Sequence, residues 1–207
     1  MINDFNNKLD VMIPNPGCEL NYNRDYELLI ATVLSAQCTD KRVNEVTSVL
    51  FSNYDIYGLS KAKKSDIEKI IRSVGTSSRK SEYVLKIAQN LVQNYNGVVP
   101  NDREYLESLP GVGRKTCNVV LSNLFDVPAI AVDTHVERVS KRLGIARKND
   151  NVLTVEKKLM KKIPMNLWSR THHQLVLFGR YICKAKKPEC EQCLFYEECK
   201  AKEKKKI

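Results

Sequence analysis

Apolar residues recur at the spacing of an α-helix along most of this sequence. Two such stripes are Tyr26, Leu29, Ile30, Val33 and Leu34, and Val84, Ala88, Leu91, Val92 and Tyr95. This periodicity predicts amphipathic helices whose apolar faces form the core. Short runs such as 129–132 could be extended, yet no pair of alternating runs flanks an Asn-Gly or Asp-Gly turn. We therefore predict an all-α protein of about ten short helices joined by brief polar loops.

Three residues mark where helices are expected to end. Gly97 and Gly144 each follow an apolar stripe, at the position where a left-handed residue closes a helix. Pro164 is expected to stop another helix after Ile163.

The charge balance indicates a polyanionic partner. The 207 residues are enough for one large or two small domains, and they carry 34 Lys and Arg against 24 Asp and Glu, a formal net charge of +10. Nucleic acid is therefore the first candidate partner. Part of the excess is a basic end that needs no partner, formed by Lys202, Lys204, Lys205 and Lys206. Whether the partner is nucleic acid must therefore be decided from the sequence motifs.

The first residues show no basic stretch followed by an apolar run, and no 18 uncharged apolar residues follow one another. We expect a soluble, cytoplasmic protein. The seven cysteines are unevenly spread, since four crowd into the last stretch while Cys18, Cys38 and Cys117 are scattered. This distribution argues against a secreted disulfide scaffold and favours a metal site in a reducing compartment.

A Pro-Gly-Val-Gly turn between two helical segments is the first chemical motif. Residues 106–120 read LESLPGVGRKTCNVV. Gly111 and Gly113 can take positive φ and approach another surface closely, and the free N–H groups at the start of the second helix can hold a phosphate beside Arg114. The alternative is an ordinary helix connection, because Pro-Gly turns are common.

Lys115 lies in the first turn of the helix after this hairpin. The helix field, burial and the neighbouring Arg114 are all expected to favour its neutral amine. A neutral amine can attack a sugar carbon and form a Schiff base.

A carboxylate stands at the start of a later helix, in the segment 131–135, AVDTH. Thr134 and Glu137 have the spacing of a capping box, which predicts that Asp133 precedes the cap and has no local duty. A free carboxylate could stabilise positive charge on a sugar and move protons. The alternative is that Asp133 and Thr134 are ordinary capping residues.

Four cysteines form the pattern C-x6-C-x2-C-x5-C, namely Cys183, Cys190, Cys193 and Cys199. Four thiolates suit either tetrahedral zinc or a cubane iron-sulfur cluster. Lys184, Lys186 and Lys187 lie between the first two cysteines, where a metal-bound loop would hold their charges for phosphates. The alternative for these lysines is a solvated basic loop.

The strings LPGVGRKT and VDTH and the cysteine spacing together resemble the endonuclease III family of helix-hairpin-helix DNA glycosylases, from about Asn21 to Cys199. The resemblance implies a [4Fe-4S] cluster on the four cysteines, a nucleophilic Lys115 and a catalytic Asp133. It also implies that the hairpin binds a phosphate through Gly111, Val112, Gly113, Arg114 and Thr116 without reading sequence.

The resemblance further implies two helical domains with a DNA cleft between them, across which Lys115 and Asp133 would face each other. The domains would comprise residues 18–127 and residues 1–17 plus 128–207. The implied activity is removal of oxidised pyrimidines from duplex DNA, followed by strand cleavage through β-elimination. A monomer that works at the nucleoid and binds no membrane is expected.

Gln37 and Thr76 bear on damage recognition. In the family, the glutamine at the position of Gln37 fills the gap left by a flipped nucleotide, although a capping or solvent contact is the simpler interpretation. Relatives usually place a bulky apolar wedge where this chain has Thr76, and threonine intercalates poorly. We therefore expect lesion search or opposite-base preference to differ from that of the family.

Two other functions fit part of the pattern. A purely hydrolytic mismatch glycosylase would keep the hairpin, the aspartate and the cluster, but those relatives lack the lysine and have an extra C-terminal domain. This sequence has Lys115 and ends at Ile207. The second alternative is a DNA-binding relative without catalysis, which a strand-nicking assay separates from an enzyme.

Overall fold

The computed structural model describes residues 2–201, and in this part of the chain the regular structure is entirely helical. The all-α prediction is confirmed. The lysines at positions 202, 204, 205 and 206 lie outside the described residues. The α-helices are α1 (Ile2–Met12), α2 (Asp25–Leu34), α3 (Asp40–Asn53), α4 (Ile56–Lys61), α5 (Lys64–Ile70), α6 (Ser77–Tyr95), α7 (Arg103–Ser108), α8 (Arg114–Leu124), α9 (Thr134–Arg142), α10 (Val152–Lys162) and α11 (Trp168–Leu177).

Four shorter helical turns complete the regular structure of the described residues. They are the 3₁₀ turns η1 (Arg72–Val74), η2 (Met165–Leu167) and η4 (Cys190–Gln192) and the π-helical turn η3 (Phe178–Ile182). Within residues 2–201, no helix combines the length and the hydropathy that a membrane span requires.

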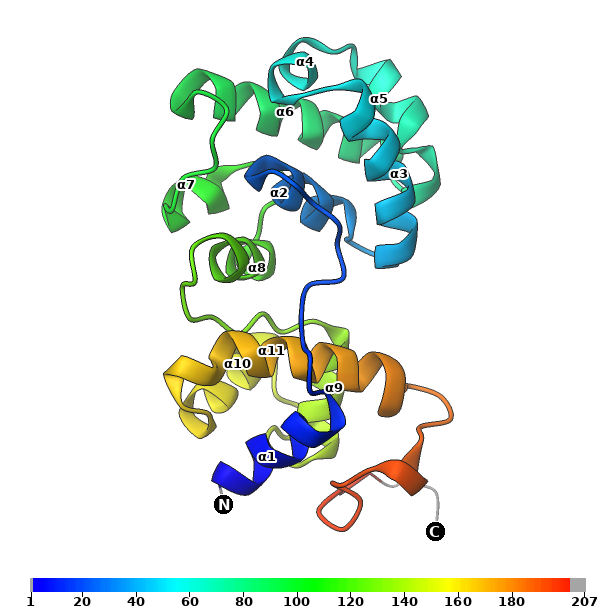
Figure 1. Ribbon diagram of the computed structural model, residues 1–207, viewed down its shortest axis with the longest axis vertical. Coiled ribbons are helices and arrows are strands. Elements are labelled where there is room, and N and C mark those ends of the chain that lie inside the picture. The colour runs from blue at the N-terminus through cyan, green and yellow to red at the C-terminus, as the bar shows by residue number, and fades with distance from the viewer. Residues whose placement is uncertain (1, 202–207) are drawn as a thin grey trace. The chain divides into compact units, whose positions relative to one another are not determined.

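The chain divides into two compact units (Figure 1). Unit 2 is the contiguous segment Cys18–Phe125, and unit 1 combines the residues up to Gly17 with those from Asp126 onward. The division predicted from the sequence has the same first boundary and places the second boundary two residues later, after residue 127. Unit 1 is therefore built from both ends of the chain.

Unit 2 is built around α2, which is buried from Tyr26 to Leu34 and contacts α3, α6 and α8. The apolar stripe predicted on this segment therefore lies in the core. The long helix α6 ends where expected, because Asn96 and Gly97 both take left-handed conformations, with φ of 51° and 82°. The N–H of Gly97 donates to the carbonyl oxygen of Leu91 at 2.9 Å, which closes the helix end.

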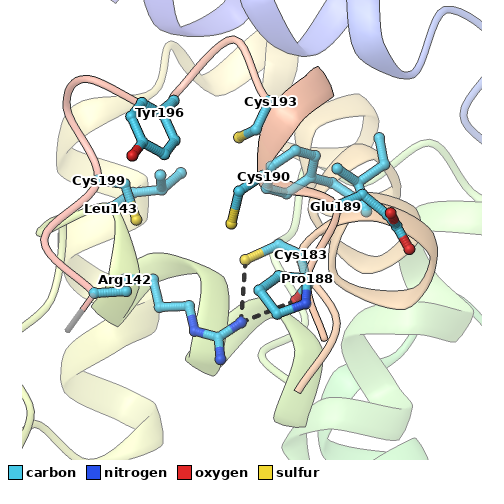
Figure 2. A pocket seen from close by; sticks show the side chains of 12 residues that line it. Arg142, Leu143, Cys183, Pro188, Glu189, Cys190, Cys193, Tyr196 and Cys199 are labelled. Carbon is cyan, nitrogen blue, oxygen red and sulfur yellow. Dashed lines mark hydrogen bonds between the residues drawn. The ribbon is translucent and has the colours of Figure 1, made fainter. Parts of the chain in front are cut away.

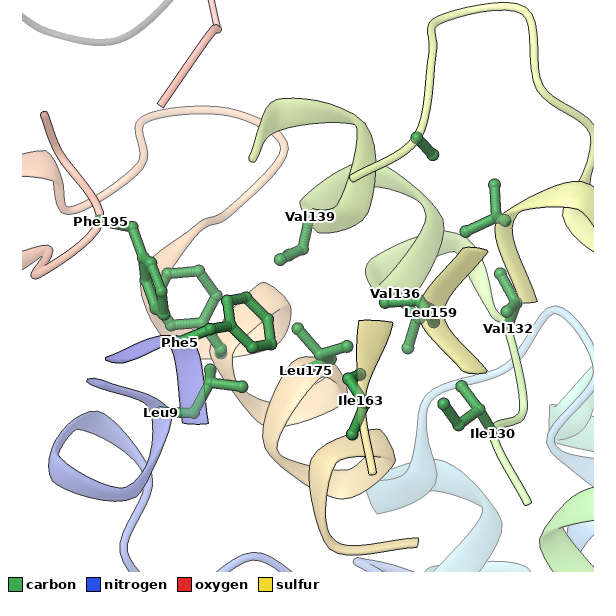
Figure 3. Packing of buried hydrophobic residues seen from close by; sticks show 13 residues of the cluster. Phe5, Leu9, Ile130, Val132, Val136, Val139, Leu159, Ile163, Leu175 and Phe195 are labelled. Atoms are coloured by element: carbon green, nitrogen blue, oxygen red, sulfur yellow. The ribbon is translucent and has the colours of Figure 1, made fainter. Parts of the chain in front are cut away.

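Unit 1 has a separate core to which α1 and the cysteine loop both contribute (Figure 3). The Phe195 ring packs against the rings of Phe5 and Phe178, with centroid separations of 5.4 and 5.6 Å. Because Phe195 lies between the third and fourth cysteines, this packing anchors the end of the loop.

Helix ends in unit 1 follow the expected signals. Gly144 has a φ of 71° after α9, as predicted. Helix α10 ends at Lys162, one residue earlier than expected, because Ile163 precedes Pro164 and takes an extended conformation.

Candidate active site and cysteine loop

The hairpin lies within unit 2, between α7 and α8. Arg103 on α7 donates from Nη2 to Oδ1 of Asn118 on α8 at 2.8 Å, which ties the two helices together. At the turn, the N–H of Val112 donates to the carbonyl oxygen of Leu109 at 3.1 Å, and the Val112 side chain is buried. The apolar residue of the turn thus points inward, and the backbone on either side is exposed.

The two hairpin glycines serve different purposes. Gly111 has a φ of 81°, and a Cβ added there would lie 2.5 Å from Cδ2 of Tyr83, so a side chain would collide with that ring. Gly113 has a φ of −103°, so it does not use the positive φ that a glycine allows. Apart from its own chain neighbours, no atom of the described residues lies within 4 Å of the position that a Cβ would take at Gly113. Gly113 therefore leaves the first turn of α8 open to an approaching ligand.

Three consecutive residues open α8. Arg114 and Lys115 are exposed, and Thr116 is buried. The expected burial of Lys115 was therefore wrong, because its position in the first turn directs it to solvent.

Asp133 is the N-cap of α9, contrary to the prediction that Thr134 caps this helix. Oδ1 of Asp133 accepts hydrogen bonds from the N–H groups of His135 at 2.9 Å and Val136 at 2.8 Å. Among the described residues, Oδ2 accepts none. The capping box does not form: the N–H of Glu137 donates to the carbonyl oxygen of Asp133 at 2.9 Å, and the Glu137 side chain accepts from Lys141 at 2.6 Å. The Asp133 carboxylate therefore caps its own helix. The two hydrogen bonds hold Oδ1 in place and so fix the direction of Oδ2.

Two arginines on α9 connect the helix that Asp133 caps to the cysteine loop. Arg138 donates from Nη2 to the carbonyl oxygen of Gly179 at 2.6 Å and to that of Cys183 at 3.1 Å. Arg142 is buried and donates from Nη1 to the carbonyl oxygen of Lys184 at 2.7 Å. Sequence reasoning missed this pair, because arginines four residues apart on a helix are typical of an exposed face.

The four cysteines line one hollow in unit 1, and their sulfur atoms face its interior (Figure 2). Arg142 donates from Nη1 to Sγ of Cys183 at 3.4 Å. Burial raises the pKa of the Cys193 thiol to about 11. In the described part of the chain, no three ligand-type side chains converge on a point as a single metal ion requires. The sulfur atoms instead surround a space.

This arrangement fits a polynuclear cluster. Thiolates are the ligands of iron-sulfur clusters, and these four cysteines would hold such a cluster. The lining is otherwise mostly apolar, with Leu143, Phe178, Ile182 and Pro188 beside the cysteines. Such a lining limits the access of water to a cluster.

The three lysines between Cys183 and Cys190 are not equivalent. Lys184 forms an ion pair with Glu189 at 2.9 Å, which offsets its charge within the loop. Lys186 and Lys187 are exposed. Lys184 is thus paired with a carboxylate, whereas Lys186 and Lys187 present their charges at the surface of the loop.

Gln37 and Thr76 lie in two different loops of unit 2, and both are exposed. Both also have positive φ, 57° for Gln37 and 44° for Thr76. A left-handed backbone is uncommon for residues other than glycine, and such residues cluster at functional sites.

Comparisons with known proteins place the chain in a family. A family model described as HhH-GPD superfamily base excision DNA repair protein matches residues 30–165. Endonuclease III of Bacillus subtilis strain 168 is 48% identical over 202 residues, which cover 96% of this chain and 91% of that protein. The chain belongs to the endonuclease III family.

Solved structures of endonuclease III support the same family assignment. A non-covalent endonuclease III–DNA complex matches with a TM-score of 0.92 and 49% identity, covering 97% of this chain and 95% of the matched one. A trapped covalent endonuclease III–DNA intermediate gives the same score and identity, covering 97% and 96%. The resemblance stated from the sequence is therefore confirmed. This member of the endonuclease III family is a DNA glycosylase and abasic-site lyase of base excision repair.

Proposed function

We propose that this enzyme removes oxidised pyrimidines from duplex DNA, with Lys115 as the nucleophile and Asp133 as the catalytic carboxylate. The observation that carries the proposal is the position of Lys115, an exposed amine in the first turn of α8, directly after the glycine hairpin. A close structural relative has been trapped as a covalent DNA intermediate, which supports a covalent mechanism.

Lys115 supplies the electron pair for the first step. Its neutral amine bonds to the deoxyribose C1′ while the bond from C1′ to the base breaks, and the base leaves with a proton. Opening of the sugar ring gives an imine between Lys115 and C1′. Loss of a proton from C2′ then expels the 3′ phosphate, and hydrolysis of the imine frees the amine.

Asp133 acts on the charge and the protons of these steps. Its Oδ1 is held by two backbone N–H groups, so the carboxylate cannot rotate freely. The remaining oxygen is therefore preorganised to stabilise positive charge on the sugar and to accept or return a proton. Lys115 belongs to unit 2 and Asp133 to unit 1.

The hairpin positions the DNA. Backbone N–H groups around Gly113 and at the start of α8 bind one phosphate, and Arg114 adds a full positive charge. Such a contact carries no sequence information, which suits an enzyme that must find damage in any sequence.

A strand-nicking experiment tests this function. Duplex DNA with one thymine glycol is expected to be cut by the enzyme without alkali, because β-elimination follows base loss on the same lysine. Measured under single-turnover conditions, the appearance of cut strand should follow base release. Base release that leaves the strand intact until alkali is added would instead indicate a purely hydrolytic glycosylase.

The four cysteines are proposed to hold a [4Fe-4S] cluster. When bound, the cluster supplies four iron–thiolate links that fix the loop, a structural role that needs no redox change. Thiolate ligation requires a reducing compartment, which supports a cytoplasmic enzyme that works at the nucleoid.

Metal analysis of a cysteine variant tests the cluster. The purified enzyme should contain about four iron and four sulfide per chain, and Cys199→Ser should lose most of both because one ligand is missing. Cys18→Ser is the matched control, since Cys18 lies outside the loop and should leave the iron content unchanged. One zinc ion per chain in place of iron and sulfide would overturn the assignment.

Lys186 and Lys187, the exposed lysines of the loop, should strengthen DNA binding to the same extent for every base sequence. Replacing Lys186 and Lys187 by alanine should lower the slope of log affinity against log salt by about 1 to 2, since each phosphate contact contributes about 0.9. The control replaces both Lys184 and Glu189 by alanine, which removes an ion pair without changing the net charge. An unchanged slope in the first variant would contradict the role of the loop.

A further inference from the structure

Lys80 is a buried lysine in the first turn of α6, and its ammonium group is bound entirely by backbone carbonyls. Its Nζ donates to the carbonyl oxygens of Leu34 at 2.9 Å, Ala36 at 2.7 Å and Val74 at 2.9 Å. An ammonium has three N–H donors, so these contacts use all of them. Burial lowers the pKa of Lys80, which means that the three carbonyls must support its charge in place of water.

The first two acceptors belong to the segment that presents Gln37. Leu34 is the last residue of α2, so its carbonyl lacks a partner within the helix. Ala36 is the second residue of a turn that is closed by the N–H of Cys38 and the carbonyl oxygen of Ser35 at 3.1 Å. Gln37 is the third residue of this turn. Lys80 therefore holds the turn directly before its exposed, left-handed residue.

The third acceptor belongs to the segment that presents Thr76. Val74 ends the turn η1, and Gly75 and Thr76 follow with φ of 69° and 44°. The backbone N–H of Lys80 also donates to the carbonyl oxygen of Thr76 at 3.0 Å. Lys80 thus holds this segment through both its backbone N–H and its side chain.

The strained backbone explains why such an anchor is needed. Left-handed conformations of residues other than glycine persist only where the surroundings hold them. Gln37 and Thr76 belong to segments almost forty residues apart in sequence, and Lys80 bonds to both segments. No acidic side chain takes part in these three contacts, so the lysine connects backbone to backbone.

We propose that Lys80 is a positioning residue that holds Gln37 and Thr76 as one rigid pair for the extrusion of a damaged nucleotide. This inference rests on the proposed glycosylase function and on the role that the family resemblance implies for Gln37, which is to fill the gap left by a flipped nucleotide. A preorganised pair binds DNA without first having to order two loops. The benefit is largest where a paired, stacked base must leave the helix and smaller where the base is already missing.

The test compares two substrates under single-turnover conditions. Lys80→Met keeps the length of the side chain but has no donors. Base excision from a thymine glycol paired with adenine should fall about tenfold or more, whereas borohydride trapping at a preformed abasic site should change less than about threefold. The matched control is Lys86→Met on the same helix, because Lys86 is exposed and its side chain pairs with Glu82 at 2.7 Å. The control should behave as the wild type.

Hydrogen exchange of the free proteins provides a second readout. In Lys80→Met, backbone amides of residues 35–38 and 74–77 should exchange faster, while those of the hairpin 109–114 should not change. Equal loss on both substrates, no loss of excision, or faster exchange throughout unit 2 would each overturn the proposal and leave Lys80 as a general stabiliser.

If Lys80→Met does not fold by circular dichroism, the same ratio of excision to trapping is measured for Lys80→Arg, which keeps the charge and several donors. The ratio should still fall, because the longer planar group cannot reproduce all three contacts, and an unchanged ratio would overturn the proposal. Failure of the wild type to trap on abasic DNA would instead refute the function of Lys115, so the two failures are distinguishable.

Discussion

Replacement of Lys115 by alanine is expected to abolish borohydride trapping and strand cleavage, with a loss of about 10³-fold or more in the single-turnover rate. The reason is that the imine needs a primary amine at C1′, and no neighbouring side chain of α8 can supply one. Arg114, beside it, is a guanidinium that stays protonated. The measurement is covalent capture of the enzyme on thymine-glycol duplex, followed by denaturing electrophoresis.

Duplex binding by this variant should remain close to that of the wild type. The hairpin backbone that holds the phosphate is unchanged, and Lys115 is exposed, so its removal leaves no cavity. Lys41→Ala, at an exposed lysine on α3, serves as the control and should trap fully. A Lys115→Ala variant that still formed the adduct would remove the assignment of the nucleophile.

Asp133→Asn is expected to lower base excision by about 10²- to 10⁴-fold while the protein stays folded. Asparagine caps helices about as well as aspartate, so its side-chain oxygen can keep the bonds to the N–H groups of His135 and Val136. What disappears is the negative charge and the second proton acceptor. The free energy of unfolding should change by only about 0.5 kcal/mol, which reflects the lost attraction to the helix end.

Asp133→Ala separates the catalytic role of this residue from its role as a helix cap. It should lose excision to a similar extent and, in addition, lower the free energy of unfolding by about 1 kcal/mol because the cap is gone. Chemical denaturation of both variants beside their excision rates makes the comparison. An Asp133→Asn variant with normal excision would show that the carboxylate is only a cap.

Much of the fold could be predicted because its signals are local. The stripe from Tyr26 to Leu34 repeats at helical spacing, and α2 buries it. Gly97 follows the last apolar residue of α6 and closes that helix with positive φ. Such features depend on residues within one or two helical turns, which the sequence shows directly.

The site residues that were predicted wrongly or missed have two causes. Either two residues compete for the same role, or the role depends on tertiary contacts. Asp133 and Thr134 can both cap a helix, and the glutamate at position 137 favoured the wrong one. Burial of Lys80 could not be predicted, because two of its three acceptors, the carbonyls of Leu34 and Ala36, lie more than forty residues away in sequence. Pairing of Lys184 with Glu189 likewise depends on how the cysteine loop folds back.

Mapping the site of covalent attachment identifies the nucleophile of this enzyme. The enzyme is reduced with borohydride on duplex DNA containing thymine glycol, digested with nuclease and protease, and analysed by mass spectrometry. The account predicts that the sugar fragment is carried by Lys115, in a peptide from the start of α8. Attachment at any other lysine, or at the amino terminus, would contradict it.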